Sequence, residues 1–275
     1  MNMHEGIDRN RFRLITLNTW KSSGNYSLRI RAMANGLREL CPTLICLQES
    51  FHSVDNQWNT AEFLAKVLAM DFRLVSYRRK QRPLDRLPTD SYSGLAVLSR
   101  YPIEKSSELQ LETVALDGER IAQITTVSLA NIPLTVVNLH LTHLPDYAAL
   151  RVRQLDHVLA YCCRQNLANT LICGDFNAPF SLFSEAGGLA GRERLQDTWR
   201  TIHGELPQPS TIHANYRDPV METETGSIDH ILYLRGAGPG LQFIASDIVL
   251  DGPDPDFGVV PSDHCGVCLD FITPQ

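Results

Sequence analysis

Six short apolar runs in this sequence each meet polar side chains that can bind a metal ion or a phosphate, always at one end of the run. Four runs end at such residues, which are Asn18, Gln48 with Glu49, Asn138 with His140, and Asp175 with Asn177. Two runs begin after such residues, which are Asp229 with His230 and Asp263 with His264. If the last two runs are strands that point opposite to the first four, all these side chains gather at one rim, as in an active site built on a rigid sheet.

These residue types fit the hydrolysis of a phosphate ester. That reaction needs neutralised non-bridging oxygens, an aligned water, and a proton or cation for the departing oxygen. Glu49 is a hard oxygen ligand of the kind that holds Mg²⁺ or Mn²⁺ while water and substrate fill other positions. Asn18 can hydrogen-bond that carboxylate or ligate through its own amide oxygen. The rim therefore offers a candidate site for a divalent metal ion.

Asp175 and Asn177 can act on the water and on the phosphate. They lie two residues apart, so both side chains point to one face if the strand continues through Phe176. An acid and an amide so placed can take a proton from water and donate to a phosphate oxygen. Taken alone, the run from Gly174 to Asn177 can also form an Asx turn, so the pairing is a hypothesis.

Three histidines are candidates for acid–base chemistry or phosphate contact. His264 follows Asp263, and a carboxylate neighbour orients an imidazole and favours its charged form. Asp229, from another strand, is a candidate orienting partner for it. Strand alternation places His140 on the rim face, and it places His143 on the opposite face if the strand reaches that far, so we select His140 and not His143. A zinc hydrolase is the weaker alternative, because the close histidine pair of such sites is missing.

The elements that must position these residues follow an α/β order. Helical spacing of apolar residues marks 27–40, 60–70 and 146–163, each next to a strand-like run. The stretch 72–140 reads as consecutive strands, which usually pair antiparallel across short turns. Two β-rich halves with helices outside predict an α+β protein with four α/β/β/α layers, in which two packed, mostly antiparallel mixed sheets are flanked by helices.

The composition indicates an ordinary globular protein. The chain has 275 residues, of which 43% are hydrophobic and 20% charged, and no linker or repeat divides it. We expect one catalytic domain over residues 1–275, with residues 1–11 as a flexible N-terminus. No signal peptide is visible there, and no run approaches the roughly 18 apolar residues of a membrane helix, so we expect a cytoplasmic protein without a transmembrane segment. The seven cysteines lie mostly inside apolar runs, which suits a reducing compartment.

The charge balance limits the partners. A net charge of −6 argues against a protein whose main task is to coat nucleic acid, because such binding depends on cationic contacts with phosphates. One basic patch consists of Arg78, Arg79, Lys80, Arg82 and Arg86. Pro83 and Pro88 interrupt this stretch, which predicts a loop. It is either a solvated loop or the element with which a nuclease would hold a nucleic-acid backbone.

The motifs together resemble the endonuclease/exonuclease/phosphatase superfamily, also called deoxyribonuclease-I-like. The segments that carry the resemblance are residues 17–20 (LNTW), 47–49 (LQE), 93–103 (SGLAVLSRYPI), 138–141 (NLHL), 174–177 (GDFN), 228–231 (IDHI) and 262–264 (SDH). They occur in the family's order and extend the resemblance from Leu14 to Phe271. Nearly the whole chain is covered.

The resemblance implies a metal site and a water site. Glu49 would bind the catalytic divalent ion, Mg²⁺ or Mn²⁺, with help from Asn18, and Asp263 would lie near the metal. Asp175 would activate or orient the attacking water. Asn177 would steady the phosphoryl group.

The resemblance also implies a histidine pair and an activity. Asp229 and His264 would form an acid–histidine pair whose role as acid, base or electrostatic clamp stays open, and His140 would contact phosphate or assist the leaving group. We therefore predict a metal-dependent hydrolase of phosphoric ester bonds, favouring sphingomyelinase-like or small-molecule phosphodiesters over monoesters. The alternatives are an endonuclease or exonuclease acting on DNA or RNA, and a catalytically silent binding module of the same fold.

Overall fold

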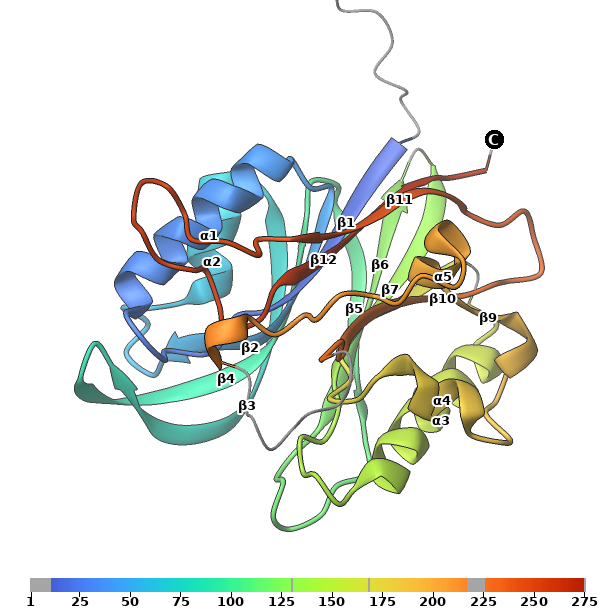
Figure 1. The fold of residues 1–275 in the computed structure, drawn as a ribbon, viewed down its shortest axis with the longest axis horizontal. Helices are drawn as coiled ribbons and strands as arrows, with labels where there is room; N and C mark the ends of the chain where they lie inside the picture. Colours follow the sequence, from blue (N-terminus) through green and yellow to red (C-terminus); the bar gives the residue numbers. More distant parts are fainter. Residues whose placement is uncertain (1–10, 130, 168, 217–225, 275) are drawn as a thin grey trace, which may run out of the picture.

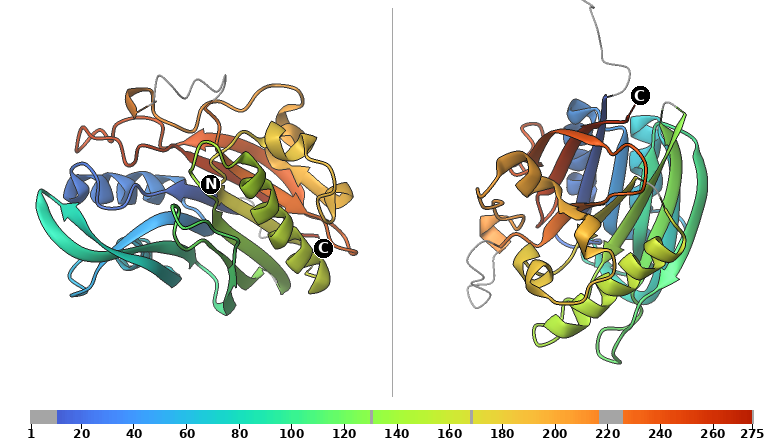
Figure 2. Two further views of the ribbon diagram at one scale, coloured as in Figure 1. Left: turned by 90° about the horizontal axis from the view of Figure 1, so that it is seen from below. Right: turned by 90° about the vertical axis from the view of Figure 1, so that its right-hand side faces the viewer.

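Two six-stranded β-sheets pack face to face, and helices lie against their outer faces (Figures 1 and 2). The computed structural model describes residues 11–129, 131–167, 169–216 and 226–274. The four-layer architecture predicted from the sequence is confirmed. Among the helices in these ranges, none is long and apolar enough to cross a membrane.

The first sheet contains the first four strands of the chain and the last two, and the second sheet contains the six strands between them. In spatial order, the first sheet contains β11 (Gln242–Val249), β12 (Gly266–Ile272), β1 (Arg11–Asn18), β2 (Leu44–Ser53), β4 (Leu87–Ser99) and β3 (Asp71–Leu84). The second contains β5 (Ile103–Gln110), β6 (Ile121–Leu129), β7 (Ile132–His140), β8 (Thr170–Asp175), β10 (Asp229–Leu234) and β9 (Leu195–Asp197). The helices are α1 (Tyr26–Leu40), α2 (Thr60–Leu68), α3 (Ala148–Arg164), α4 (Phe180–Glu185) and α5 (Thr198–His203), with short 3₁₀ turns at Arg192–Arg194 and Ala214–Tyr216.

Strand direction brings the polar run ends to one rim. β1 and β2 are parallel and joined through α1, whereas β12 runs antiparallel to β1. In the other sheet β7 and β8 are parallel and joined through α3, whereas β10 runs antiparallel to β8. Parallel neighbours need such helical crossovers, because a short turn can only reverse the chain. The expected opposite direction of the last two polar-ended strands is thus confirmed.

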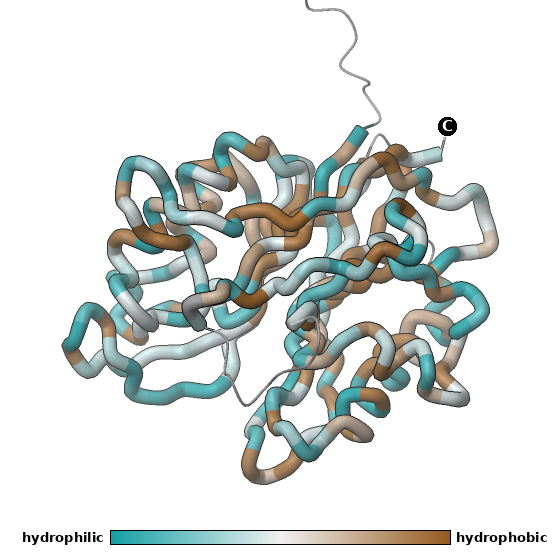
Figure 3. The backbone as a smooth tube through the Cα atoms, viewed as in Figure 1, coloured by the Kyte–Doolittle hydropathy of each residue, from teal (hydrophilic) through white to brown (hydrophobic). Residues whose placement is uncertain are grey.

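The hydrophobic core has one layer between the sheets and one under each helical layer. The central layer includes Leu14, Val97, Val136, Leu171 and Leu269, all fully buried. Figure 3 shows hydrophobic residues gathered on the central strands of both sheets. Because these strands are covered on both faces, they read as continuous apolar runs rather than as alternating ones. This burial makes the strands a fixed frame for the side chains at their ends.

The basic stretch around Arg78 is not a loop, contrary to the sequence prediction. It belongs to a long hairpin of β3 and β4 whose two turn residues, Asp85 and Arg86, both have positive φ. Pro83 lies opposite Pro88, one pair away from the turn. Opposite residues of an antiparallel pair are alternately hydrogen-bonded and not hydrogen-bonded to each other. Two prolines at a non-hydrogen-bonded position therefore remove no hydrogen bond between the strands. The prolines therefore suit the hairpin instead of breaking it.

The N-terminal prediction needs one correction. Arg11, expected in a flexible segment, is the first residue of β1, where it pairs with Ile272 and its guanidinium lies 2.6 Å from a carboxylate oxygen of Asp270. Arg11 is therefore part of the sheet. The rest of the expected flexible segment, residues 1–10, lies outside the described residues.

Candidate active site

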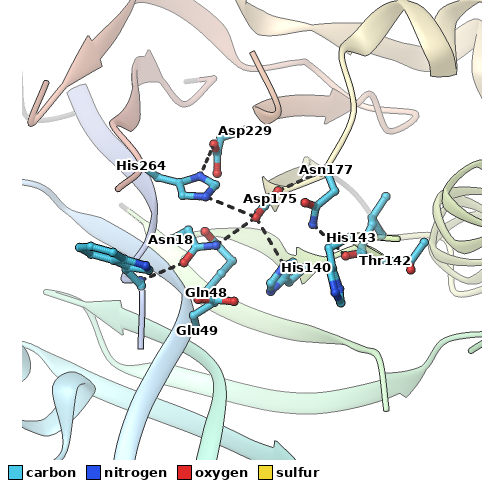
Figure 4. A network of polar contacts seen from close by, with 12 residues as sticks. Asn18, Gln48, Glu49, His140, Thr142, His143, Asp175, Asn177, Asp229 and His264 are labelled. Carbon is cyan, nitrogen blue, oxygen red and sulfur yellow. Dashed lines mark hydrogen bonds and ion pairs between the residues drawn. The ribbon is translucent and has the colours of Figure 1, made fainter. Parts of the chain in front are cut away.

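The carboxylate of Asp175 is the point on which the rim residues converge (Figure 4). Its Oδ2 accepts a hydrogen bond from Asn18 Nδ2 at 3.0 Å. The same oxygen lies 3.4 Å from His140 Nε2 and 3.9 Å from His264 Nε2. Its Oδ1 accepts from the backbone N–H of Asn177 at 2.8 Å. Side chains from β1, β7 and the entry to β12 thus meet at the end of β8.

The surroundings of Asp175 tune its basicity. The residue is only 2% exposed, and burial, followed by the negative charge of Asp229, raises its pKa to about 7. Burial disfavours the charged form of a carboxyl group, and a second carboxylate acts in the same direction. An acid with such a pKa exchanges its proton near neutrality, as a general base for water must.

His264 is paired with a buried acid. Its Nδ1 lies 2.8 Å from Oδ2 of Asp229, and both residues are buried. Burial alone would lower the pKa of His264, but the charge and hydrogen bond of Asp229 outweigh it and raise the pKa to about 10. At neutral pH the imidazole is therefore a cation, with its Nε2–H on the side of Asp175.

His140 has the opposite character, although it neighbours the same carboxylate. Burial, and then the positive charges of Arg120 and Lys21, lower its pKa well below the usual value. Asp175 lies at 3.4 Å, beyond a normal hydrogen-bond length. His140 is therefore a neutral imidazole at physiological pH.

Asn177 reaches the site by a route that the sequence did not show. β8 ends at Asp175, and Asn177 has a left-handed φ of 51°, so strand alternation does not extend to it. The contact of its N–H with Asp175 is an Asx turn, the alternative considered for this motif. Its side-chain amide donates a hydrogen bond to the carbonyl of Leu141 at 3.0 Å, and among the described residues its second amide hydrogen has no acceptor.

Glu49 is presented by an irregularity in β2. The pairing of β2 with β4 shifts register between Leu47 and Ser50, and Glu49 has a φ of 54°. A β-bulge re-aims a side chain, and a left-handed conformation costs a non-glycine residue about 1–2 kcal/mol. The side chain is 13% exposed and contacts the ammonium group of Lys21. Strain of this kind is typical of functional positions.

The acidic residues at this side fit a divalent cation. Burial raises the pKa of Asp263, and the negative charge of nearby Glu49 adds to that rise. Two carboxylates that repel each other form a hard-oxygen site that a divalent cation relieves, and carboxylate and amide oxygens are the ligands that Mg²⁺ and Mn²⁺ prefer. Asn18 lies next to them, and its Oδ1 accepts from the N–H of Trp20. The donor chemistry of Glu49, Asn18 and Asp263 therefore suits the metal that the family implies.

A second group of potential ligands is less suitable for a metal. Asp175, Asp229 and His264 offer atoms that lie within 4.8 Å of one another. However, the Nδ1 of His264 is engaged with Asp229, and a protonated imidazole has no lone pair for a metal ion. We therefore favour the oxygen site around Glu49.

Four residues near the rim were absent from the sequence-based site. They are Lys21, Asp117, Arg120 and His143. Arg120 and Asp117 form a buried ion pair, and Arg120 also donates to the carbonyl of His140 at 3.2 Å. The placement of His143 on the opposite face required the strand to reach it, but β7 ends at His140, so alternation does not apply to His143. For Asp117 and Arg120, the sequence signal was an acid and an arginine three residues apart in a turn-like stretch.

A family comparison identifies the family of the chain. The model of the Endonuclease/Exonuclease/phosphatase family matches residues 15–264, so the chain belongs to that family. The match begins in β1 and ends at His264, and it includes every rim residue described above.

The chain is also similar to one characterised relative in sequence and to several solved structures in fold. Tyrosyl-DNA phosphodiesterase 2 of Xenopus laevis is 26% identical over 266 residues, which are 93% of this chain and 66% of that protein. The chain thus spans just under two thirds of that relative's length. A D. rerio TDP2 structure complexed with a single-strand DNA product has a TM-score of 0.73 and 18% identity, covering 96% of this chain and 99% of that one. An endonuclease/exonuclease/phosphatase from Beutenbergia cavernae has a TM-score of 0.71 and 20% identity, covering 97% and 72%.

Proposed function

We propose that this protein hydrolyses phosphodiester bonds with the help of a divalent metal ion. The observation that carries the proposal is the convergence of Asn18, His140 and His264 on one oxygen of Asp175, whose pKa is raised to about 7. A buried carboxylate of this kind accepts a proton from water at neutral pH better than an exposed aspartate does. Membership of the phosphoesterase family supports the reaction class.

The residues around Asp175 divide the remaining tasks. Asn18 and the N–H of Asn177 hold the carboxylate in place, and the second amide hydrogen of Asn177 can steady a phosphoryl oxygen. The cationic His264, fixed by Asp229, stabilises negative charge that develops on the phosphate. The neutral His140 offers a hydrogen bond to a phosphate or leaving-group oxygen.

The metal site completes this assignment. Glu49, Asn18 and Asp263 are the residues that would hold Mg²⁺ or Mn²⁺. When bound, the cation supplies positive charge that neutralises the non-bridging oxygens of the substrate. Lys21, which contacts Glu49, would have to release it when the cation binds.

The direct test is hydrolysis of bis-p-nitrophenyl phosphate. We expect activity with Mg²⁺ or Mn²⁺ that EDTA abolishes, and we expect Glu49→Gln to lose both activity and calorimetric cation binding. Glu39→Gln, an exposed substitution of the same type on α1, is the matched control and should keep both. Activity that survives EDTA, or an active Glu49→Gln protein, would refute the metal-dependent mechanism.

A second candidate function is the cleavage of DNA phosphodiesters. The relative named tyrosyl-DNA phosphodiesterase 2 favours it, as do the cationic residues on the β3–β4 hairpin. Binding that depends on contacts with several backbone phosphates weakens steeply as salt increases. We therefore expect a single-stranded oligonucleotide to lose affinity between 50 and 200 mM salt, roughly in proportion to the phosphates contacted. A flat response would argue for a small substrate.

A further inference from the structure

A groove lies between the β3–β4 hairpin and the loop that precedes β6. Its volume is about 580 Å³. The hairpin wall includes Arg78, Arg79 and Lys80, and the loop wall includes Gly118 and Glu119. The groove therefore joins the two sheets on the side where both carry charged residues.

A strained bulge turns Arg78 toward this groove. The pairing of β3 with β4 shifts register between Tyr77 and Lys80, and Arg78 within this shift has a φ of 68°. Arg78 thus resembles Glu49 on β2, because each is a left-handed residue in a bulge that redirects its side chain. Across the groove, a Cβ added to Gly118 would lie 3.5 Å from Nε of Arg78, so the guanidinium rests against that glycine.

The charges on the hairpin wall are not all neutralised. Arg79 forms an ion pair with Asp90, but within the described ranges neither Arg78 nor Lys80 has an ion pair. The positive charge of Arg78 comes first among the causes that lower the pKa of Lys80, followed by burial and then by Arg82 and Lys21. Cations that repel one another in this way form a site that an anion would stabilise. Glu119, on the facing wall, is an exposed acidic residue that reduces this potential only in part.

His143 lies near the groove, close enough to Arg78 for the positive charge of that guanidinium to contribute to lowering its pKa. Its Nδ1 lies 2.9 Å from Nη2 of Arg120 and 3.1 Å from a carboxylate oxygen of Asp117. Because Arg120 can only donate, Nδ1 is the acceptor and the hydrogen lies on Nε2. The side chain is 51% exposed, and burial and then Arg120 lower its pKa. His143 is thus a neutral donor that faces solvent.

Arg120 connects His143 to the candidate active site. The same guanidinium that fixes His143 donates to the carbonyl of His140, whose ring lies beside Asp175. Figure 4 shows His140 and His143 side by side below Asp175. An anion held at His143 would therefore be a close neighbour of the reacting group.

We propose that Arg78, Lys80 and His143 form a subsite for a second phosphate group of the substrate, next to the scissile phosphodiester. The subsite rests on the proposed function, since it needs a reacting phosphate beside it. The guanidinium of Arg78 matches phosphate in geometry, and the ammonium group of Lys80 adds a point charge. The N–H of His143 can donate a further hydrogen bond. The second phosphate is either the next one in a nucleic-acid strand or a phosphomonoester on a small molecule.

The test compares two substrates that differ by one phosphate. Thymidine 5′-(p-nitrophenyl phosphate) has a single phosphate, and the same compound with a 3′-phosphate has two. We expect kcat/KM to be at least about tenfold higher for the second compound, because charge-assisted hydrogen bonds to phosphate are worth at least that factor. Arg78→Gln and His143→Ala should reduce this preference toward one.

Arg86→Gln is the matched control. It removes the same charge from the same hairpin, but at the exposed turn and away from the groove residues. It should keep the preference of the unmodified protein. Equal kcat/KM for the two substrates, or an Arg86→Gln variant that behaves like Arg78→Gln, would overturn the subsite.

Binding without turnover separates this proposal from the proposed function. If neither compound is cleaved with Mg²⁺ or Mn²⁺, the proposed function fails, and calorimetry with thymidine 3′,5′-bisphosphate against thymidine 5′-monophosphate still tests the subsite. Equal affinities would overturn it, and an affinity for the bisphosphate that depends on Arg78 would support it. A trinucleotide preferred over the bisphosphate assigns the second phosphate to a strand, whereas equal affinities for these two assign it to a small molecule.

Discussion

Two histidines flank the same oxygen of Asp175 and have opposite charge states. His264 lies 3.9 Å from Oδ2 with a pKa raised to about 10, and His140 lies 3.4 Å from it with a pKa lowered well below its usual value. Both are buried, so burial cannot explain the difference. The charged neighbour other than Asp175 decides the charge state. His264 has the carboxylate of Asp229, which favours its cation, and His140 has the guanidinium of Arg120, which disfavours it.

The comparison shows how one fold places an acid and a neutral donor around a common base. Each sheet strand fixes a side chain at the rim, but the charge of that side chain depends on residues from other elements. Asp229 comes from β10, and Arg120 from the loop before β6. Changing those outer partners should therefore change the two histidines separately.

The largest effect is expected when the shared carboxylate is removed. Asp175→Asn eliminates the group that both histidines face and that accepts a proton from water. We expect kcat/KM with bis-p-nitrophenyl phosphate to fall by about 10²–10⁴-fold, the usual contribution of a general base. Asp251→Asn, at an exposed position, should retain full activity. An Asp175→Asn protein with near-normal kcat/KM would show that the convergence on this oxygen has no chemical role.

The next effect concerns the cation on the His140 side. Arg120→Gln leaves the buried Asp117 carboxylate without its ion-pair partner, and breaking such a pair usually costs about 3–5 kcal/mol. Urea unfolding measures this loss, and Arg153→Gln, from an exposed ion pair, should leave the midpoint nearly unchanged. The pKa of His140, followed by NMR, should rise in Arg120→Gln. If it stays where it was, Arg120 does not control the charge of His140.

A smaller effect is expected from the partner of His264. Asp229→Asn keeps the shape of the pair but removes the charge that favours the imidazolium. The NMR titration of His264 should shift from about pH 10 toward neutrality, and kcat/KM should fall by about 10–100-fold, as is common when an orienting group is lost. His140 should titrate as before, which makes it the internal control. A His264 pKa that is unchanged would mean that Asp229 is not its main partner.

The pH dependence of stability should show the smallest differences, with opposite signs for the two residues. His140, lowered below 6.5, binds fewer protons in the folded state, so its stability contribution is present above about pH 6.5 and is lost as the pH falls below it. His264, raised to about 10, contributes fully below pH 6.5 and loses that contribution as the pH rises to about 10. Urea unfolding between pH 5 and 10 should show a flatter acid side in His140→Gln and a flatter alkaline side in His264→Gln. The reverse assignment would contradict the pKa ordering.

The rim could be predicted from the sequence because its strands are fully buried. Runs such as 14–17 and 171–173 are apolar except for the buried Thr16, so the polar residue that follows each one marks the strand end. Alternation failed where strands stopped or bulged. It could not place His143, which lies beyond the end of β7, and it gave no sign that Glu49 and Arg78 are left-handed residues in bulges.

The basic hairpin is a second region that local sequence patterns could not predict. Proline content predicts a loop when pairing is unknown, and only the register that places Pro83 opposite Pro88 makes two strands possible. Likewise, the groove walls come from residues 76–80 and 115–119, which are far apart in the chain. No local pattern reports such a neighbourhood.

The sequence by itself determined the layered fold and the residue types at the rim, because these depend on hydrophobic periodicity and on side-chain chemistry, and the order of its motifs indicated the family. The tertiary structure alone decided which oxygen the rim residues share and which histidine is charged. Charge states depend on burial and on partners from distant segments, such as Asp229 for His264 and Arg120 for His140. Those contacts exist only once the two sheets have packed.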